Sequence, residues 1–463
     1  MHLLGYKSMD ESSLYVCGFN GFGQINHLCQ SSQNDASNHM YYSSPQKSAV
    51  SHAVRVVSTW SKICVITGKG HLFVGGLKHK DDNMLYSHSD QVFPDIATTC
   101  DNFTIFKRTP EKLCLMAEGE ITVQDLDITE AFQLKEVAGC DKELAVVSED
   151  QHIYSGSLHQ TVEGPVKLTM TLLCGSLKIQ SVSCGKEHVL LLSYTGEVYS
   201  YGKGSRGQLG YGDLHVDRQT TPLSVETLSG LAVTGIAAGG WHSTAVTAEG
   251  DLYVWGWNES GQLGLTNGKQ KSKDIDSTVM SALEKTSSDE LQSVNNRSMN
   301  DNSEAKKQKF SSFGNSGCSV GAGDTDFDIN EKQSFASNIK GHISTVCDEQ
   351  SSSIKLHQQR MHFIYHQDTE PVQIQGVPQV LDLPEVVKVT KVSCGSRHTA
   401  VLLDNGCLMT TGWNGYGQLC HGDVTSRDFL QTVAFFTDQQ LVVTNVFCDV
   451  WTTAIITQEI TGH

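Results

Sequence analysis

Tyr253-Val-Trp-Gly-Trp-Asn-Glu-Ser-Gly-Gln-Leu-Gly264 decides the fold, because three other segments repeat its pattern. They begin at Tyr15, Tyr199 and Met409, and each reads as a short alternating strand, a glycine, four residues and Gly-Gln. Alternation sends successive side chains to opposite faces of a sheet, and glycine permits the positive φ that a tight loop needs. The pattern therefore predicts the same strand and loop four times. The paired loop glycines are Gly18 and Gly23, Gly202 and Gly207, Gly256 and Gly261, and Gly412 and Gly417.

A second motif, an apolar stretch followed by Gly-x-x-His, precedes the first in three places and ends at His188, His242 and His398. An apolar strand and a glycine turn follow each histidine. One unit is thus strand, loop, strand, turn, strand, glycine loop and a variable last strand, which makes a four-stranded antiparallel blade. His188 and His242 are 54 residues apart, and a repeat of this length is typical of propellers.

The two ends of the chain are complementary. Residues 446–457 read as the front half of a unit, and residues 15–26 read as a second half without a front. Joining them completes a blade and closes a ring, which removes the sheet edges that invite aggregation. We therefore predict an all-β, seven-bladed β-propeller formed by residues 1–268 and 361–463. Its blades are the closing one, weaker copies at residues 56–76, 96–123 and 137–156, and full units that start near Val182, Ile236 and Val392.

Residues 269–360 differ from the rest of the chain. They are rich in Ser, Asn, Asp, Lys and Gln and show no period, and hydrophobic residues make up only 38% of the whole sequence. Such a segment cannot bury enough apolar surface to offset its chain entropy, so we predict a disordered low-complexity insertion. Its charge cluster at residues 304–309 reads either as a solvated loop segment or as a weak nuclear signal.

Charge and cysteine usage narrow the class of protein. The formal net charge is −17, whereas a protein that binds nucleic acid through its phosphates needs a surplus of Lys and Arg. We therefore expect no direct nucleic-acid binding. The negative charge makes the approach of basic partners such as histones easier. No apolar run is long enough to cross a membrane. The 14 cysteines form no CxxC pair, which predicts free thiols in the cytosol or nucleus.

The Gly-x4-Gly-Gln-Leu-Gly run with its upstream Gly-x-x-His resembles the regulator-of-chromosome-condensation repeat. Within that family, residues 237–243, residues 255–262 and the split terminal blade are most similar to one small vertebrate member. This resemblance implies a chromatin-associated partner of a JmjC-domain dioxygenase, acting in histone methylation, chromosome segregation and spindle organisation. It also implies a nuclear and chromosomal location, with a cytoplasmic pool, and a monomer or a heterodimer. In the family, histidines such as His188, His242 and His398 support the blade by bonding to the backbone.

Enzymatic interpretations of the sequence are weak, and we expect no catalytic residues, no cofactor and no metal. Residues 202–207 match G-x-G-x-x-G, but a dinucleotide site needs that string between a strand and a helix, and β pattern lies on both sides here. His188, His242 and His398 fall in different blades, without the short spacing of a zinc site.

The loops that follow the first strand of each blade are the best candidates for partner binding. They carry Trp60, Lys186, Glu187, Trp241, Arg397 and Trp451. In a propeller such loops gather on one face, and aromatic and arginine side chains are the usual anchors of interfaces. The alternative is that Trp241 and Trp451 only plug the central shaft.

Two competing functions come from other members of the family. The founding member is a guanine-nucleotide exchange factor for a small GTPase and uses a basic N-terminal tail on nucleosomes, whereas this chain starts its first strand by Tyr15 without a basic tail. A plant relative senses ultraviolet light through repeated Gly-Trp-Arg-His-type loops, and only residues 240–242 come close to that pattern.

Overall fold

The computed structural model describes residues 12–29, 39–76, 86–88, 92–93, 97–100, 103–117, 123–128, 133–141, 143–159, 166–265, 372–383 and 387–459. The chain divides into two units, and all of the described residues belong to the one formed by Met1–Met280 and Thr369–His463. The second unit, Ser281–Asp368, and the insertion predicted at residues 269–360 lie outside the described residues.

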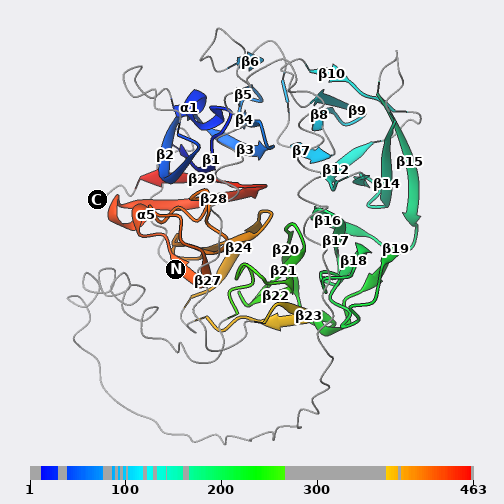
Figure 1. Ribbon diagram of the computed structural model, residues 1–463. Coiled ribbons are helices and arrows are strands. Elements are labelled where there is room, and N and C mark those ends of the chain that lie inside the picture. The colour runs from blue at the N-terminus through cyan, green and yellow to red at the C-terminus, as the bar shows by residue number, and fades with distance from the viewer. Residues whose placement is uncertain are drawn as a thin grey trace, which may run out of the picture. The chain divides into compact units, whose positions relative to one another are not determined.

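Seven sheets form a β-propeller, as the repeats predict (Figure 1). The closing blade consists of β28 (Leu441–Asp449), β29 (Thr452–Glu459), β1 (Ser13–Phe19) and β2 (Tyr41–Ser51). Blade 1 is β3 (Ala53–Ser58), β4 (Lys62–Thr67), β5 (Leu72–Gly76) and β6 (Tyr86–His88). Blade 2 is β7 (Ala97–Cys100), β8 (Phe103–Thr109), β9 (Lys112–Ala117) and β10 (Gln124–Asp125). Blade 3 is β12 (Leu134–Gly139), β13 (Glu143–Ser148), β14 (Ile153–His159) and β15 (Lys167–Cys174), with β11 (Asp127–Ile128) added in parallel to β15.

The three strong repeats follow in order. Blade 4 is β16 (Ile179–Cys184), β17 (His188–Ser193), β18 (Val198–Lys203) and β19 (Arg218–Ser224). Blade 5 is β20 (Val233–Ala238), β21 (His242–Thr247), β22 (Leu252–Trp257) and β23 (Ile374–Val380). Blade 6 is β24 (Val389–Cys394), β25 (His398–Leu403), β26 (Leu408–Gly412) and β27 (Arg427–Thr432). Short helices α1 (Gln24–Cys29), η3 (Glu226–Leu228) and α5 (Ala434–Asp438) accompany these strands.

The first strands of the blades form the inner wall of the ring. Each contacts the first strand of the next blade in the order β3, β7, β12, β16, β20, β24 and β28, and β28 contacts β3 again. Apolar side chains fill the space between neighbouring sheets; one such cluster joins Leu190 of blade 4 to Ala245 and Trp255 of blade 5. The core is therefore a series of layers between blades, with each blade stabilised by its two neighbours.

The closing blade confirms the complementarity of the chain ends. β1 pairs antiparallel with β29, with Ser13 opposite Thr457 and Gly18 opposite Thr452, and β2 pairs with the other edge of β1. Gly18 has a φ of +118°, and a Cβ there would lie 2.2 Å from the Trp451 carbonyl oxygen. Only glycine fits this position, which explains the first glycine of the loop motif.

Blade 5 brackets the predicted insertion. β22 and β23 are adjacent antiparallel strands, with Trp257 opposite Ile374. The Asn258 side-chain amide donates a 2.9 Å hydrogen bond to the Val372 carbonyl oxygen. β23, the last strand of blade 5, therefore lies beside the end of β22, although the predicted insertion separates the two strands in the sequence.

One disulfide corrects the prediction of free thiols throughout. Cys17 of β1 and Cys420 of blade 6 are bonded, with their Cα atoms 5.9 Å apart. The two residues are 403 positions apart in the sequence, so only the closure of the ring brings them together. Cysteine spacing could not reveal this pair.

Candidate partner-binding face

Each repeat histidine is buried and joins its own blade to the next. The Nε2 atoms of His188, His242 and His398 lie 2.8, 2.9 and 3.0 Å from the hydroxyl oxygens of Ser243, Thr399 and Thr453. These hydroxyls donate in turn to backbone carbonyls of Gln208, Gln262 and Gln418 in the histidine's own blade. The family expectation that the histidine bonds to the backbone is therefore wrong here, because a hydroxyl of the next blade stands between them.

The same network fixes the protonation of these rings. Since each hydroxyl donates to a carbonyl, it accepts from Nε2–H, which leaves Nδ1 without a proton. The Nδ1 atoms have no hydrogen-bond partner among the described residues. Burial lowers the pKa of each of the three histidines to about 3, so the rings are neutral. They hold the blades together and are not poised for proton transfer near neutral pH.

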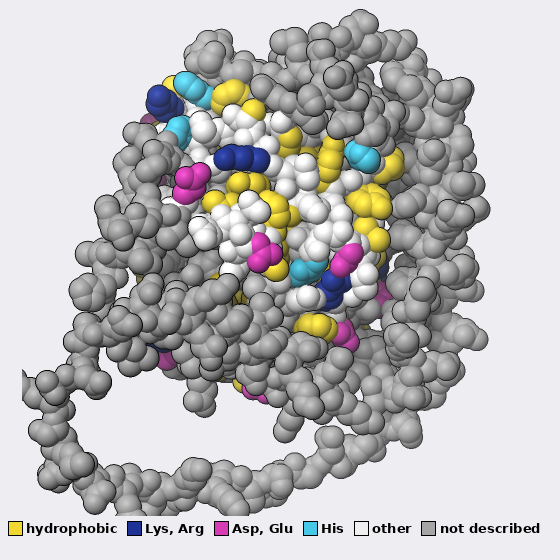
Figure 2. All heavy atoms as spheres, turned by 90° about the vertical axis from the view of Figure 1, so that its left-hand side faces the viewer, with side chains coloured by type: hydrophobic (Ala, Val, Ile, Leu, Met, Phe, Trp, Pro, Cys, Tyr) yellow, Lys and Arg dark blue, Asp and Glu magenta, His cyan; other side chains and the backbone are white. Residues whose placement is uncertain are grey.

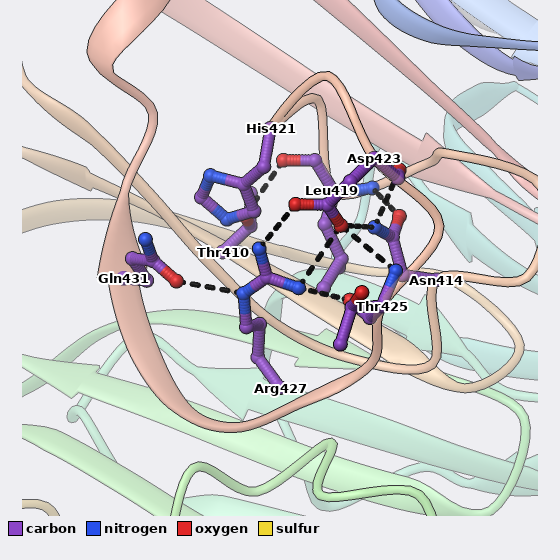
Figure 3. A network of polar contacts seen from close by, with 8 residues as sticks. All are labelled: Thr410, Asn414, Leu419, His421, Asp423, Thr425, Arg427 and Gln431. Atoms are coloured by element: carbon purple, nitrogen blue, oxygen red, sulfur yellow. Dashed lines mark hydrogen bonds and ion pairs between the residues drawn. The ribbon is translucent and has the colours of Figure 1, made fainter.

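The glycine loops are held in shape by their own polar side chains. In blade 6, the Asn414 side chain accepts from the Leu419 N–H and donates to the Asp423 carbonyl oxygen (Figure 3). Arg427 completes this network through hydrogen bonds to Asp423 and Gln431 at 2.7 Å. The glutamine of each Gly-Gln accepts from the N–H two residues earlier, as Gln262 does from Ser260. These bonds make the loops rigid platforms for the side chains they carry.

Two loops of each strong blade lie together at one end of the blade. The backbone N–H groups of Lys203, Trp257, Trp413 and Phe19 donate to the carbonyls of Glu187, Trp241, Arg397 and Trp451 at 2.8–3.0 Å. Each bond ties the start of a glycine loop to the loop after the first strand. We call the surface formed by these paired loops the glycine-loop face.

One half of this face is a stack of cations and indoles. Arg206 lies over both Trp241 and Trp257, with its Cζ atom 4.4 and 4.5 Å from the ring centroids. Lys186 also covers Trp241, and Arg397 covers Trp257 from blade 6. Contacts of this length are favourable because the ring faces are electron-rich, so the stack links blades 4, 5 and 6.

Carboxylates anchor that stack. Glu187 accepts a 3.1 Å hydrogen bond from the Trp241 indole N–H and is paired with Lys203. Burial opposes ionisation of Glu187, but its hydrogen bonds to Lys203 and Trp241 prevail and lower its pKa. Arg397 lies 4.0 Å from Glu259. The cations and the indoles are thus held in fixed positions.

The other half of the face is aromatic. Trp413 packs edge-on against Tyr416 and Trp451, with centroids 5.0 and 4.7 Å apart. Phe19 continues the cluster, 4.9 Å from Tyr416 and stacked on Trp60 at 4.7 Å. These rings come from blade 6, the closing blade and blade 1, so the cluster spans the point where the ring closes.

All six residues predicted for partner binding lie on this face, although in two groups. Lys186, Glu187, Trp241 and Arg397 belong to the cation–indole half, and Trp60 and Trp451 to the aromatic half. Trp241 is 5% exposed and packs beneath Lys186 and Arg206, whereas the other five are half-buried. Trp241 is thus mainly structural, and the half-buried side chains are the accessible ones.

Sequence reasoning missed several members of the face. Trp257 and Trp413 directly follow Gly256 and Gly412 in the loop motif, and Arg206 precedes Gly207. Their signal was present, because a large side chain recurs beside the repeat glycines. The hydroxyl partners of the histidines were also missed; Ser243 and Thr399 directly follow His242 and His398, and Thr453 follows Thr452 at the histidine position.

A polar pocket of about 190 Å³ opens between blades 3 and 4. Its charged lining includes Glu143 and Arg218, which form an ion pair at 2.6 Å, and Glu187 with Lys203. Gly202 and Lys203, the first two residues of the 202–207 string, border this pocket, and β19 rather than a helix follows the string. The loop therefore lacks the strand-to-helix setting of a dinucleotide site.

Other features that would suggest chemistry are scarce in the described part of the chain. No group of three or more His, Cys, Asp or Glu side chains there could hold a metal ion. Within the same residues, no helix has the length and apolar character needed to span a membrane. Figure 2 shows the side of the ring that bears β2 and α5, where a few basic, acidic and histidine side chains lie among hydrophobic and other side chains.

Models of the regulator of chromosome condensation (RCC1) repeat match this chain. One matches residues 195–246 and 249–277, and a second matches residues 179–208, 233–262 and 389–418. The matched residues contain the histidines and glycine loops of blades 4, 5 and 6. This chain is an RCC1-repeat protein. The resemblance inferred from its motifs is thereby confirmed.

Curated relatives of this RCC1-repeat protein extend the similarity. It is 33% identical over 290 residues to human RCC1 domain-containing protein 1 and 34% identical over 287 residues to the mouse protein. Each match covers 62% of this chain and 58% of the relative, so the chain spans less than two thirds of their length. It is also 34% identical to the Arabidopsis thaliana ultraviolet-B receptor UVR8, over 32% of this chain and 35% of the receptor.

Solved structures share the fold of this RCC1-repeat protein. Prp20p from Saccharomyces cerevisiae, described with its binding properties to Gsp1p and histones, has a TM-score of 0.62 at 10% identity, covering 98% of this chain and 93% of Prp20p. Human WBSCR16 has a TM-score of 0.62 at 13% identity, covering 96% of this chain and all of that one. At these identities the likeness concerns the propeller architecture alone.

Proposed function

We propose that this RCC1-repeat propeller is a non-enzymatic, chromatin-associated scaffold that binds a JmjC-domain dioxygenase of the histone demethylase type. In this role it influences histone methylation, chromosome segregation and spindle organisation, as a monomer or in a heterodimer with that partner. It works in the nucleus and on chromosomes, with a cytoplasmic pool. The choice of partner rests on the resemblance of the repeat motifs described above, and the chain is similar to mammalian RCC1 domain-containing protein 1.

The distribution of tryptophan carries the proposal that the glycine-loop face binds the partner. Five of the six tryptophans lie on that face, and only Trp255 is in the core with no exposed surface. Four of the five remain half-buried. Tryptophan and arginine dominate the binding energy of interfaces, so a rigid cluster of both is a suitable anchor.

The geometry of the face favours binding in a second way. Arg206 and Arg397 are already stacked on indole rings, and the glycine loops are pinned by their Asn and Gln side chains. Side chains that are ordered before binding lose little rotamer freedom when a partner arrives. The net charge of −17 further favours basic surfaces, including histones.

Guanine-nucleotide exchange on a small GTPase is the alternative function. Prp20p, described with its binding to Gsp1p, shares this fold, but at 10% identity that supports the architecture only. Release of labelled nucleotide from purified small GTPases separates the two functions. Clear acceleration by this chain would make the pure scaffold untenable.

Affinity purification from nuclear extract with mass spectrometry tests the proposal directly. We would use the intact chain and a chain lacking residues 270–360 side by side. A stoichiometric JmjC-domain protein with both chains is the expected result and attributes binding to the propeller. Recovery of a small GTPase in its place, released by added nucleotide, would favour the exchange factor.

A further inference from the structure

The contact between blade 6 and the closing blade carries a cysteine where the other strong repeats carry glycine. Cys420 directly follows Gly-Gln-Leu, as Gly210 and Gly264 do in blades 4 and 5. The φ angles of the three residues are 66°, 82° and 67°. Glycine adopts this left-handed conformation freely, whereas a residue with a Cβ is strained in it. The fold therefore holds Cys420 in a conformation suited to glycine.

The partner of Cys420 also occupies a defined repeat position. Cys17 precedes Gly18 as Trp255 precedes Gly256 and Thr411 precedes Gly412. Each of these side chains reaches the glycine loop of the preceding blade: Trp255 donates to the Gln208 carbonyl and Thr411 to the Gly261 carbonyl. Cys17 makes the equivalent contact, but at this boundary both positions carry sulfur and a covalent bond replaces the hydrogen bond.

This bond joins the strand that closes the ring to the last full blade. β1 is also held by its ladders with β29 and β2 and by apolar packing against blades 1 and 6. Cys17 is fully buried and Cys420 is 1% exposed, so neither sulfur is open to solvent while β1 is in place. Reagents reach the pair only when β1 opens locally, and the bond in turn opposes that opening.

We propose that Cys17 and Cys420 form a thiol–disulfide exchange site that locks the closure of the ring, with a low-molecular-weight disulfide such as oxidised glutathione as its substrate. One thiolate attacks the glutathione disulfide, forms a mixed disulfide and releases one glutathione thiolate. The second thiolate then attacks the protein sulfur of the mixed disulfide and releases the second glutathione. Two protein thiols are oxidised, one glutathione disulfide is reduced to two thiols, and the released thiolates take up the two cysteine protons.

The lock is reversible. An excess of reduced glutathione runs the same two steps backwards and returns two buried thiols. In cytosol or nucleus, where glutathione keeps most thiols reduced, such disulfides are transient and report oxidation. Oxidation then strengthens the attachment of β1 without changing the hydrogen-bonded fold.

Hydrogen exchange on the full chain tests this inference. The protein is equilibrated with oxidised or reduced glutathione, and the Cys17–Cys420 linkage is mapped by peptide mass spectrometry without reduction. We expect the linked peptide only in the oxidised sample, and amide exchange of β1 about 30-fold slower there, the effect of a typical disulfide on opening. Exchange of β21 in blade 5 should be equal in both samples.

Two variants restore the residues of the other repeats and so keep the fold. Cys420→Gly and Cys17→Thr should each abolish the difference between oxidised and reduced samples in β1. Cys407→Ser, which removes a free half-buried thiol of the same blade, should retain it. Equal exchange of β1 in both wild-type samples, or absence of the linked peptide after oxidation, would overturn the inference. Neither result depends on partner binding.

Discussion

The Nε2 atom of His242 lies 2.9 Å from the Oγ1 atom of Thr399, a residue 157 positions later in the sequence. Thr399 in turn donates to the Gln262 carbonyl of the histidine's own blade, at 2.7 Å. One hydroxyl thus links the second strand and the glycine loop of blade 5 to blade 6. Two further copies of this arrangement join blades 4 and 5, and blade 6 and the closing blade.

The other blades can be compared at the positions equivalent to His242 and Thr399. At three boundaries a histidine of one blade meets a hydroxyl residue of the next. Blade 2 also has a hydroxyl residue at this position, Thr104, although Lys62 stands at the histidine position of blade 1. Blade 3 has Glu143 at the histidine position, and Val189 faces it from blade 4; the closing blade has Thr452 there, and Ile63 is the corresponding residue of blade 1. At the three boundaries that have the link, histidine and hydroxyl therefore belong to one unit that crosses from one repeat to the next.

Removing the hydroxyl should destabilise the propeller. Thr399→Val nearly preserves the shape of the side chain but leaves the His242 N–H and the Gln262 carbonyl buried without their partner. We expect the free energy of unfolding to fall by about 1–3 kcal/mol in chemical denaturation. Thr399→Ser keeps the hydroxyl and should stay close to wild type. Equal stability of the valine and serine variants would show that the link contributes little.

The same histidines should make stability depend on pH. Burial lowers their pKa to about 3, against 6.5 for an ordinary histidine. Between these values the unfolded chain binds more protons, so the free energy of unfolding falls as pH drops below 6.5, by up to about 1.4 kcal/mol per histidine and pH unit. Above pH 6.5 this contribution is constant.

Two half-buried acids, Glu136 and Asp449, change the stability in the opposite direction. Burial raises the pKa of Glu136 to about 7 and that of Asp449 to about 6, so these groups favour the folded state at lower pH. A variant isolates the histidine effect from them. His398→Gln should reduce the slope of unfolding free energy against pH by about one proton between pH 4 and 6, measured by denaturation across that range. An unchanged slope would mean that His398 titrates normally in the folded chain.

The strong repeats were predictable because their signals are local. The loop glycines and histidines of blades 4, 5 and 6 give both the strands and the positions of the loops. The closing blade followed from the incomplete ends. The six candidate residues fell on one face because loop position in a propeller is fixed by strand order.

The remaining features depend on the contact between blades, which local patterns do not encode. Lys62 takes the histidine position in blade 1, and its buried ammonium group donates to the Ala117 carbonyl of blade 2 at 2.6 Å. The parallel strand β11 on blade 3 and the Cys17–Cys420 bond also arise only after the ring has formed. The burial of Trp241 beneath Lys186 and Arg206 likewise depends on a contact between blades 4 and 5.

Deletion of residues 270–360 should leave the propeller folded. The deleted segment lies outside the described residues, and β22 and β23 already meet at Trp257 and Ile374. Closing a connection depends only weakly on its length, so we expect the melting temperature to change by no more than about 2 °C. Thermal unfolding followed by circular dichroism measures this. A large loss would mean that the segment stabilises the ring.

Trp241 and Arg397 should respond differently to truncation. Trp241 is 5% exposed, so Trp241→Ala should cost about 3–5 kcal/mol of stability. Arg397 is half-buried, and Arg397→Ala should cost less than about 1 kcal/mol. Combining Trp241→Ala with Arg397→Ala should also weaken partner binding, but the loss of stability caused by Trp241→Ala would obscure the effect on binding. Chemical denaturation of the two single variants measures both losses of stability. Equal losses would contradict the assignment of Trp241 to structure and of Arg397 to binding.

The most direct test of the binding face is recovery of the JmjC-domain partner from nuclear extract by wild-type protein, Arg397→Ala and Tyr194→Ala, with quantification by mass spectrometry. Tyr194 is 51% exposed in the turn at the opposite end of blade 4, so its variant is a matched control. We predict about tenfold lower recovery for Arg397→Ala, with Tyr194→Ala equal to wild type. Full recovery by Arg397→Ala together with loss by Tyr194→Ala would contradict the account and move the interface to the other face.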